Sequence, residues 1–323
     1  MNKLEKLDVE EFTKEDVFST CIDRVFEKNC IKHMSLKSQW EPDPHESFFE
    51  IKGKQIKISK ANKIQNSVRF DFLCDLLKFT ISNYDLDLDC FIIFNLTDGI
   101  DPREYYTRIC FSAPLDSNHI LMPDPHIFHH IMTVDQNLEG DPAFEDKEDL
   151  VVFYGSDAGL VGGDLLNQRV KFCFKSVNNK YVKAKIANFI HFSEDMLKDL
   201  GISLKSIETD RVSIKDQLKS KYILNIDGNG SSWDRTPWAM ASNSYLIHLK
   251  SDNNTNVNWY YPFIEKLNLL PIFSEEDILN GKIQLNHNTK SKQKAFSEIL
   301  LDKGTQLEYF ARVLVKYNKI FNR

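Results

Sequence analysis

The chain has 323 residues, of which 42% are hydrophobic, 12% aromatic and 27% charged, and its formal net charge is −6. This composition is that of a folded globular protein, and the length allows two cores rather than one, because domains usually contain about 100 to 200 residues. The acidic balance argues against nucleic acid as a partner, because contacts to a phosphate backbone require an excess of Lys and Arg.

The first half of the chain alternates between helical and strand patterns. A capping-box sequence at residues 13–16 is followed by apolar residues at helical spacing, which predicts a helix as far as Phe26. Alternation of apolar and polar residues about Gly53 predicts a hairpin over 48–59. The further elements predicted are a helix over 68–81, a buried strand over 90–94, and short strands over 108–113 and 119–122.

The second half reads as apolar strands separated by helical segments, which is the pattern of an α/β protein. Strands are predicted over 150–153, 222–226 and 245–249, and a C-terminal helix over 305–323. Residues 135–150 are polar and acidic, and therefore predict a linker. The predicted domains are residues 1–145 and 146–304, with the C-terminal helix packing back on the first.

Three of the predicted strands end in loops that carry Asp, Gly or Ser. Asp98 follows the strand at 90–94, Gly155 and Ser156 follow the strand at 150–153, and residues 228–232 follow the strand at 222–226. Because ligands of an α/β sheet bind outside the carboxyl ends of its strands, these three loops form the candidate site. Each loop by itself is more typical of an ordinary turn.

The third loop, within KYILNIDGNGSSW, carries the most information. Gly228 and Gly230 allow the backbone to approach a ligand closely, and Ser231 or Ser232 can cap the helix that follows. The first turn of such a helix attracts anions, so pyrophosphate is the predicted guest. The alternative is an ordinary capped helix with buried tryptophans.

The same loop and its flanks resemble a known family. KYILNIDGNGSSW, ASNSYLIHLK and WYYPFIEKLNLLPI, all within residues 213–272, look like the signature of glycosyltransferase family 90. That family includes bacterial lipopolysaccharide-core and fungal capsule glycosyltransferases and animal protein O-glucosyltransferases. Weaker similarity is present at FIIFNLTDGI, CFSAP, ILMPD and VVFYGS.

The resemblance implies a fold of the GT-B type, in which two Rossmann-like domains face a central cleft, with inversion at the sugar and no required metal. The second domain would bind the nucleotide sugar and the first the acceptor. Asp98 aligns with the family's aspartate and is the predicted general base, against the alternative of an Asp that only caps a turn. The predicted acceptor-binding residues are Asp124 and His126. The predicted donor-binding residues are Gly155, Ser156, Arg169, Asp227, Gly228, Asn229, Gly230, Ser231, Ser232, Trp233, Arg235 and Asn243.

The chain departs from the family at its phosphate loops. Arginines of the animal enzymes are replaced here by Tyr154, Asp157 and Asp234. Arg235 and Arg169 are the candidates to replace them, because a leaving nucleoside diphosphate needs positive charge.

The sequence thus predicts an inverting glycosyltransferase that moves a glucose-like or xylose-like sugar from a UDP-sugar donor to a glycan or glycolipid acceptor, such as lipopolysaccharide core or a surface polysaccharide. The nucleotide sugar is a substrate, and neither a cofactor nor a metal is predicted. The absence of an apolar leader predicts a cytoplasmic location. Nine basic residues against three acidic ones from residue 282 onward fit either a solvated helix face or peripheral contact with an anionic membrane surface.

Other functions compete with this prediction. A non-catalytic binding protein of the same fold would bind the donor or the glycan without turnover. A phosphatase with an Asp nucleophile is disfavoured because FIIFNLTDGID lacks an acid at the nucleophile position. A Rossmann methyltransferase is disfavoured by the irregular glycine spacing over 155–163. A zinc site is disfavoured because His126, His129 and His130 lack companion ligands at zinc-like spacing. A metal-binding Asp-x-Asp motif is disfavoured because the acidic run 85–89 precedes its strand instead of following it.

Overall fold

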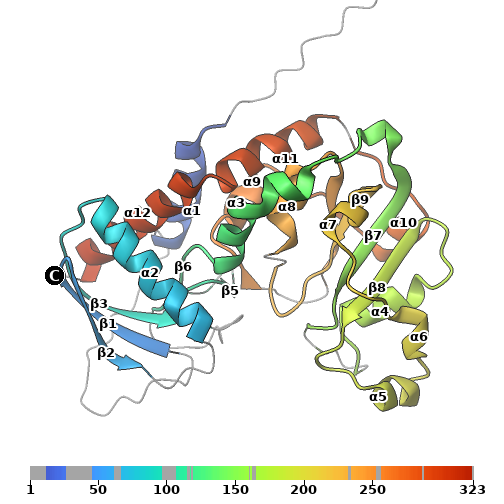
Figure 1. The fold of residues 1–323 in the computed structure, drawn as a ribbon, viewed down its shortest axis with the longest axis horizontal. Helices are drawn as coiled ribbons and strands as arrows, with labels where there is room; N and C mark the ends of the chain where they lie inside the picture. The colour runs from blue at the N-terminus through green and yellow to red at the C-terminus, as the bar shows by residue number, and fades with distance from the viewer. Residues whose placement is uncertain are drawn as a thin grey trace, which may run out of the picture. The chain divides into compact units, whose positions relative to one another are not determined.

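The fold is taken from a computed structural model and is described for residues 12–26, 46–61, 67–96, 107–114, 117, 119–159, 161, 165–231, 234–251, 256–285 and 287–321 (Figure 1). The chain divides into two compact units. The parallel-sheet unit contains Met1–Thr13, Met132–Asn254 and Ile264–Leu300. The mixed-sheet unit contains Lys14–Ile131, Thr255–Phe263 and Leu301–Arg323.

The mixed-sheet unit is built around a sheet of order β2-β1-β3-β4-β6. Its elements are α1 (Lys14–Phe26), β1 (Glu46–Gly53), β2 (Gln55–Ala61), α2 (Ser67–Asn83), β3 (Leu88–Asn95), β4 (Ile109–Cys110), β5 (Ala113–Pro114), β6 (Ile120–Leu121), β11 (Asn256–Val257) and α12 (Lys303–Phe321). The hairpin of β1 and β2 and the pair of β1 and β3 are antiparallel, whereas β3, β4 and β6 run parallel. The predicted helices, hairpin and strands of this half are confirmed, with the strand predicted at 108–113 divided into β4 and β5.

The last helix, α12, belongs to the mixed-sheet unit, where it packs against α1, α2 and β3 (Figure 1). Its buried stripe follows the helical spacing seen in the sequence. Tyr309 stacks on Trp259 with 4.0 Å between ring centroids, and Tyr317 donates a hydrogen bond of 3.0 Å to the carbonyl oxygen of Phe91. The bond of Tyr317 joins α12 to β3, more than 200 residues earlier in the chain. Together the two contacts show that α12 completes the core of this unit.

The parallel-sheet unit contains a fully parallel sheet of order β12-β10-β9-β7-β8. Its elements are η1 (Phe144–Asp146), β7 (Glu148–Ser156), α4 (Gln168–Lys175), β8 (Val182–Asn188), α5 (Glu194–Asp199), α6 (Leu204–Ile207), α7 (Ile214–Gln217), β9 (Ser220–Asn225), α8 (Arg235–Ala241), β10 (Tyr245–Leu249), β12 (Ile272–Phe273), α10 (Glu275–Leu279) and α11 (His287–Leu300). Every residue of β10 is buried, as expected for a parallel strand covered on both faces. The chain therefore has the predicted α/β class.

The strand order of this sheet contains a reversal. Numbered along the chain, its strands are arranged 2-1-3-4-5, so the connection after β7 runs one way and the connection after β9 runs the other. Crossovers between parallel strands are right-handed, so the helices that follow β7 and β9 cover opposite faces. The carboxyl ends of β7 and β9 then border the crevice in which doubly wound proteins bind their ligands.

The chain divides elsewhere than the sequence predicts. A boundary between the units falls at residues 131/132, within α3 (Pro125–Leu138), and not at 145/146. The chain also crosses between the units at 13/14, 254/255, 263/264 within α9 (Tyr261–Lys266), and 300/301. Residues 135–150 are not a linker, because they form the end of α3, η1 and the start of β7. Their acidic composition wrongly predicted a solvated linker, because Asp141 forms an ion pair with Lys147, whose side chain is fully buried.

Candidate functional site

The candidate site lies at the carboxyl ends of β7 and β9, inside the parallel-sheet unit. Gly155 and Ser156 end β7, and the segment from Asp227 to Ser231 directly follows β9. The two strands are hydrogen-bonded neighbours. Two predicted donor loops are therefore brought to one point of the fold, the reversal of the strand order.

Arg169 joins the two loops. It is the second residue of α4, whose first turn is fixed by the side chain of Asn167 accepting from the N–H of Val170 at 3.0 Å. From there Nε and Nη2 of Arg169 donate to the carbonyl oxygen of Ile226 at 3.1 and 3.0 Å, and Nη1 donates to the carbonyl and hydroxyl oxygens of Ser156 at 3.2 and 3.3 Å. The arginine thus fixes the end of β9 against the end of β7.

Arg235 reaches the same place from α8. Its Nη2 donates to the carbonyl oxygen of Tyr154 at 2.6 Å, and the residue is only 8% exposed. In the part of the chain that the structure describes, Nε of Arg235 is buried and has no hydrogen-bond partner. A buried guanidinium N–H without an acceptor is uncommon, and phosphate oxygens are strong acceptors for such a group.

Both arginines lie near the buried ring of Phe153. The Cζ atom of Arg235 is 4.7 Å from the ring centroid, and that of Arg169 is 5.7 Å away. The ring also explains Gly155, because a Cβ there would lie 2.8 Å from Cζ of Phe153. Phe153 therefore supports both cations on its face and requires a glycine in the loop.

The two guanidinium groups bring two positive charges to the site, and the carboxylates of Asp227 and Asp157 lie close enough to Arg169 to raise its pKa. Burial lowers the pKa of Arg169 to about 10, partly offset by the negative charge of Asp227. Burial also lowers the pKa of Arg235 to about 10, and the positive charge of Arg169 adds to this effect. Both side chains remain charged at neutral pH, and the lowered values mean that an anion placed beside them would relieve their desolvation and mutual repulsion.

Gly228 packs directly against Arg169. A Cβ at this position would lie 2.8 Å from Nη2 and 3.0 Å from Cζ of Arg169, and 3.1 Å from the carbonyl oxygen of Ala158. The turn is closed by the N–H of Gly228 donating to the carbonyl oxygen of Gly230 at 3.0 Å. The glycine predicted for close approach to a ligand is therefore needed for close approach to an arginine.

The helix after this loop begins later than the sequence predicts. The residue before α8 is Asp234, in helical conformation, and its side chain makes no capping hydrogen bond. Ser231 is thus not the cap, and α8 is a short helix whose contribution to the site is the side chain of Arg235. Ser232 and Trp233, both predicted to bind the donor, and the predicted base Asp98 lie outside the described residues.

Asp157 and Asp234, which stand where the family carries arginines, differ in burial. The buried carboxylate of Asp157 accepts hydrogen bonds from the N–H groups of Ile190, His191 and Phe192 at 2.6, 3.0 and 2.8 Å. Its charge is used to order the loop after β8. Asp234 is exposed.

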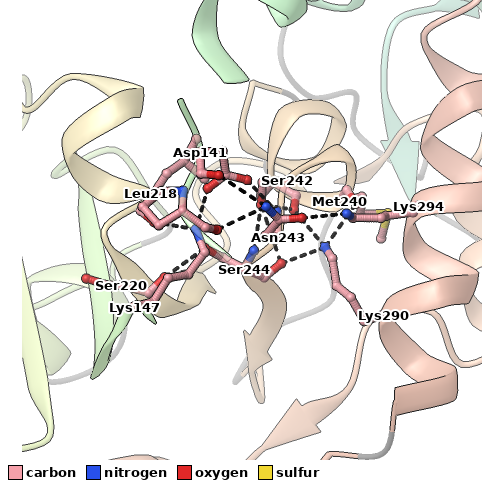
Figure 2. Close-up of polar contacts among 12 residues, drawn as sticks. Asp141, Lys147, Leu218, Ser220, Met240, Ser242, Asn243, Ser244, Lys290 and Lys294 are labelled. Carbon is pink, nitrogen blue, oxygen red and sulfur yellow. Dashed lines mark hydrogen bonds and ion pairs between the residues drawn. The ribbon is translucent and has the colours of Figure 1, made fainter. Parts of the chain in front are cut away.

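Asn243 is not part of this cluster. It lies between α8 and β10, before the strand rather than after it, and its N–H donates to Oδ2 of Asp141 at 2.6 Å (Figure 2). Its side-chain amide donates to the carbonyl oxygen of Pro142 at 3.0 Å and accepts from Lys294 at 2.6 Å. The role predicted for Asn243 in donor binding is corrected to a structural one at the amino edge of the sheet.

Lys290 belongs to the same structural cluster (Figure 2). Its ammonium group donates to the carbonyl oxygens of Met240, Ser244 and Ala239 at 3.0, 2.6 and 3.4 Å. Two of these carbonyls end α8, where helical carbonyls have no partner within the helix. Burial lowers the pKa of Lys290 well below its ordinary value, the positive charge of Lys294 adds to this effect, and the negative charge of Asp141 opposes it. The lysine thus fastens α11 to the end of α8.

We expect Lys290→Met to lower the free energy of unfolding by about 1 to 3 kcal/mol, because the carbonyl of Met240 loses its donor, while those of Ala239 and Ser244 keep only the hydroxyl of Ser242. Urea unfolding at neutral pH measures the change. The exposed Lys282→Met is the control and should stay within about 0.5 kcal/mol of the unchanged protein. Equal stability of the two variants would show that Lys290 does not fasten the helices.

The predicted acceptor residues lie in the mixed-sheet unit at the start of α3. Asp124 is buried, and its Oδ1 accepts from the N–H groups of His126 and Ile127 at 2.9 and 3.2 Å. Its Oδ2 accepts from Asn258 at 3.4 Å. These bonds cap the helix, while the side chain of His126 is exposed. The observed geometry gives Asp124 a structural role and leaves His126 accessible.

Burial raises the pKa of Asp124 above its ordinary value. Stability from such a group is complete below the unfolded pKa, about 3.9, and is lost as pH rises through the folded value. Asn also caps helices but carries no charge, so the stability of Asp124→Asn relative to the unchanged protein should improve between pH 4 and pH 7. Asp124→Ala should cost about 1 kcal/mol through the lost cap. Urea titrations at both pH values test this, and a change in the opposite direction would contradict it.

Sequence reasoning missed several groups of the site. Phe153 reads as a core residue, and the carbonyl oxygens of Tyr154 and Ile226 carry no sequence signal. His248, whose Nε2 lies 3.3 Å from Oδ2 of Asp227, was passed over within an apolar strand. A polar residue in a strand that is otherwise wholly apolar is the one signal that points to it.

Two further features are absent from the described ranges. Among these residues, no group of three or more His, Cys, Asp or Glu side chains is placed to hold a metal ion. Within the same ranges, no helix has both the length and the apolar character needed to cross a membrane.

The fold and site define a doubly wound α/β unit with an electropositive cluster at its topological switch point. The sequence matches no protein-family model and no curated protein. The resemblance to glycosyltransferase family 90 therefore rests on the motif residues of the sequence.

Proposed function

We propose that this chain is an inverting, metal-independent glycosyltransferase of the GT-B type, similar to family 90, which transfers a glucose-like or xylose-like sugar from a UDP-sugar to a glycan acceptor such as lipopolysaccharide core or a surface polysaccharide. The parallel-sheet unit binds the donor, and Asp98 acts as general base on the acceptor hydroxyl.

The observation that carries this proposal is the pair of arginines at the switch point between β7 and β9. Arg169 and Arg235 reach the ends of two adjacent strands, and Nε of the buried Arg235 has no hydrogen-bond partner among the described residues. Doubly wound sheets bind nucleotides at this location. A leaving nucleoside diphosphate needs the positive charge that two guanidinium groups supply.

The arginines also answer the departure from the family's phosphate loops. Arg235 contacts the backbone of Tyr154, a position where the animal enzymes of the family carry an arginine. A guanidinium supplied from α8 can serve the same loop from another point in the chain. This supports donor binding without the family's own arginines.

A non-catalytic protein of the same fold is the second candidate. The electropositive cluster supports binding of a nucleotide equally well in both cases. The two differ in turnover, because only the enzyme releases UDP from a UDP-sugar when an acceptor is present.

The proposal is tested by thermal shift and calorimetry with UDP, GDP, CMP and their sugars in buffer containing a chelator. UDP and its sugars should stabilise the protein, by about 2.7 kcal/mol at a hundredfold excess over Kd. Release of UDP in the presence of a glycan acceptor then separates the enzyme from the binding protein. Absence of stabilisation by every nucleotide at millimolar concentration would refute the proposal.

A further inference from the structure

A buried histidine lies behind the donor loop, at the carboxyl end of β10. His248 is 3% exposed, although its strand is otherwise apolar. Nδ1 lies 2.9 Å from Nδ2 of Asn225, the last residue of β9. Nε2 lies 3.3 Å from Oδ2 of Asp227, the residue before Gly228. The ring therefore bridges the end of β9 and the start of the loop.

With the amide nitrogen of Asn225 facing Nδ1, one tautomer of the ring fits the contact. An amide nitrogen can only donate, so Nδ1 of His248 accepts from Asn225 and carries no proton. Nε2 then carries the proton and faces Oδ2 of Asp227 at 3.3 Å, an ion-pair distance. This arrangement holds the carboxylate of Asp227 in one orientation.

Asp227 stands between the two residues that contact Arg169. The carbonyl oxygen of Ile226 accepts from Nε and Nη2 of Arg169, and a Cβ on Gly228 would lie 2.8 Å from Nη2. Fixing the side chain of Asp227 therefore fixes the peptide on either side of it. The guanidinium of Arg169 is packed against both neighbours.

We propose that His248 is a positioning residue of the donor site, which acts through the contact of its Nε2 with Oδ2 of Asp227 to hold the Ile226–Gly228 segment and Arg169 in the geometry that binds the donor's phosphates. This role rests on the proposed function, because the phosphates are those of the nucleotide sugar. His248 itself touches no ligand, since it is buried behind the loop.

Two variants separate positioning from simple structural support. His248→Gln keeps a donor near the place of Nε2 and loses the contact to Asn225, whereas His248→Asn keeps an acceptor near the place of Nδ1 and loses the contact to Asp227. Each variant removes one buried polar contact of the ring, and the two should lose similar thermal stability. We expect Gln to bind UDP within about threefold of the unchanged protein and Asn to bind about tenfold more weakly, the effect of one hydrogen bond to a charged group.

Calorimetry with UDP in chelator reads out the difference. Equal affinity of the two variants, or weaker binding by Gln than by Asn, overturns the positioning role while leaving the proposed function intact. If the unchanged protein does not bind UDP, the proposed function fails and the positioning role with it. Nitrogen-15 NMR of the unchanged protein gives a test that needs no variant: His248 should be the Nε2–H tautomer, and the Nδ1–H tautomer overturns the inference.

Discussion

Arg235→Ala is expected to weaken UDP binding about tenfold to hundredfold, because a hydrogen bond to a charged group contributes about 1.5 to 3 kcal/mol. The guanidinium is buried beside Phe153, bonded to the carbonyl oxygen of Tyr154, and has an unused Nε–H. A phosphate oxygen would accept from that group in surroundings of low dielectric, where the bond is strong. Removing the side chain removes one of the two positive charges at the switch point.

Calorimetry against a matched arginine makes this result specific. Arg211→Ala removes the same charge from an exposed position in the parallel-sheet unit and should leave the Kd for UDP within about twofold, because exposed charges are screened. Arg235→Lys keeps the charge and loses the planar fork, so its Kd should lie between those of the unchanged protein and the alanine variant. Equal loss of binding in Arg211→Ala and Arg235→Ala would mean that general charge governs binding.

Asp98→Asn should lower turnover by about 10² to 10⁴-fold, the usual contribution of a positioned general base. The neutral amide cannot take the proton from the acceptor hydroxyl, so kcat falls while the Kd for UDP stays unchanged. Initial rates of UDP release, together with calorimetry on the same preparation, measure both quantities.

Asp101→Asn is the matched control, since it makes the same change three residues along the same segment. It should retain turnover. Full activity of Asp98→Asn would favour the alternative predicted from the sequence, an Asp that only caps a turn, and leave the base to be found elsewhere. Loss of UDP binding in Asp98→Asn would place the residue in donor binding.

Much of the parallel-sheet unit could be predicted from local pattern. The continuous apolar runs at 222–226 and 245–249 correspond to β9 and β10, because strands buried on both faces need no polar positions. Gly155 and Gly228 were selected because each follows such a run, and the sequence predicted that their loops approach a ligand. In both cases the group approached is a side chain of this unit, the ring of Phe153 or the guanidinium of Arg169.

The composition of the site could not be predicted in this way. Arg169 and Arg235 lie 66 residues apart in sequence and meet only because β7 and β9 are neighbours, which depends on the order of strands in the sheet. The prediction that Asn243 binds the donor was wrong for the converse reason. Asn243 is close to the donor loop in sequence, but α8 carries the chain back to the amino edge of the sheet before β10. Residues on the two sides of one crossover helix can be close in sequence and yet lie at opposite edges of the sheet.

The linker predicted over 135–150 shows how charge misleads. Its acidic residues suggested solvent exposure, yet Asp141 binds the buried Lys147 and the N–H of Asn243. A buried lysine requires a carboxylate or carbonyl partner. An acidic stretch next to a strand can therefore be the internal counter-charge of a core as readily as a solvated connection.

A structure of the protein with UDP bound in chelator tests the central claim most directly. The account predicts the pyrophosphate at the carboxyl ends of β7 and β9, with a phosphate oxygen accepting from Nε of Arg235 and another close to Arg169 and the Gly228 turn. Nucleotide bound at a different place, or a switch point left empty at millimolar UDP, would contradict the account.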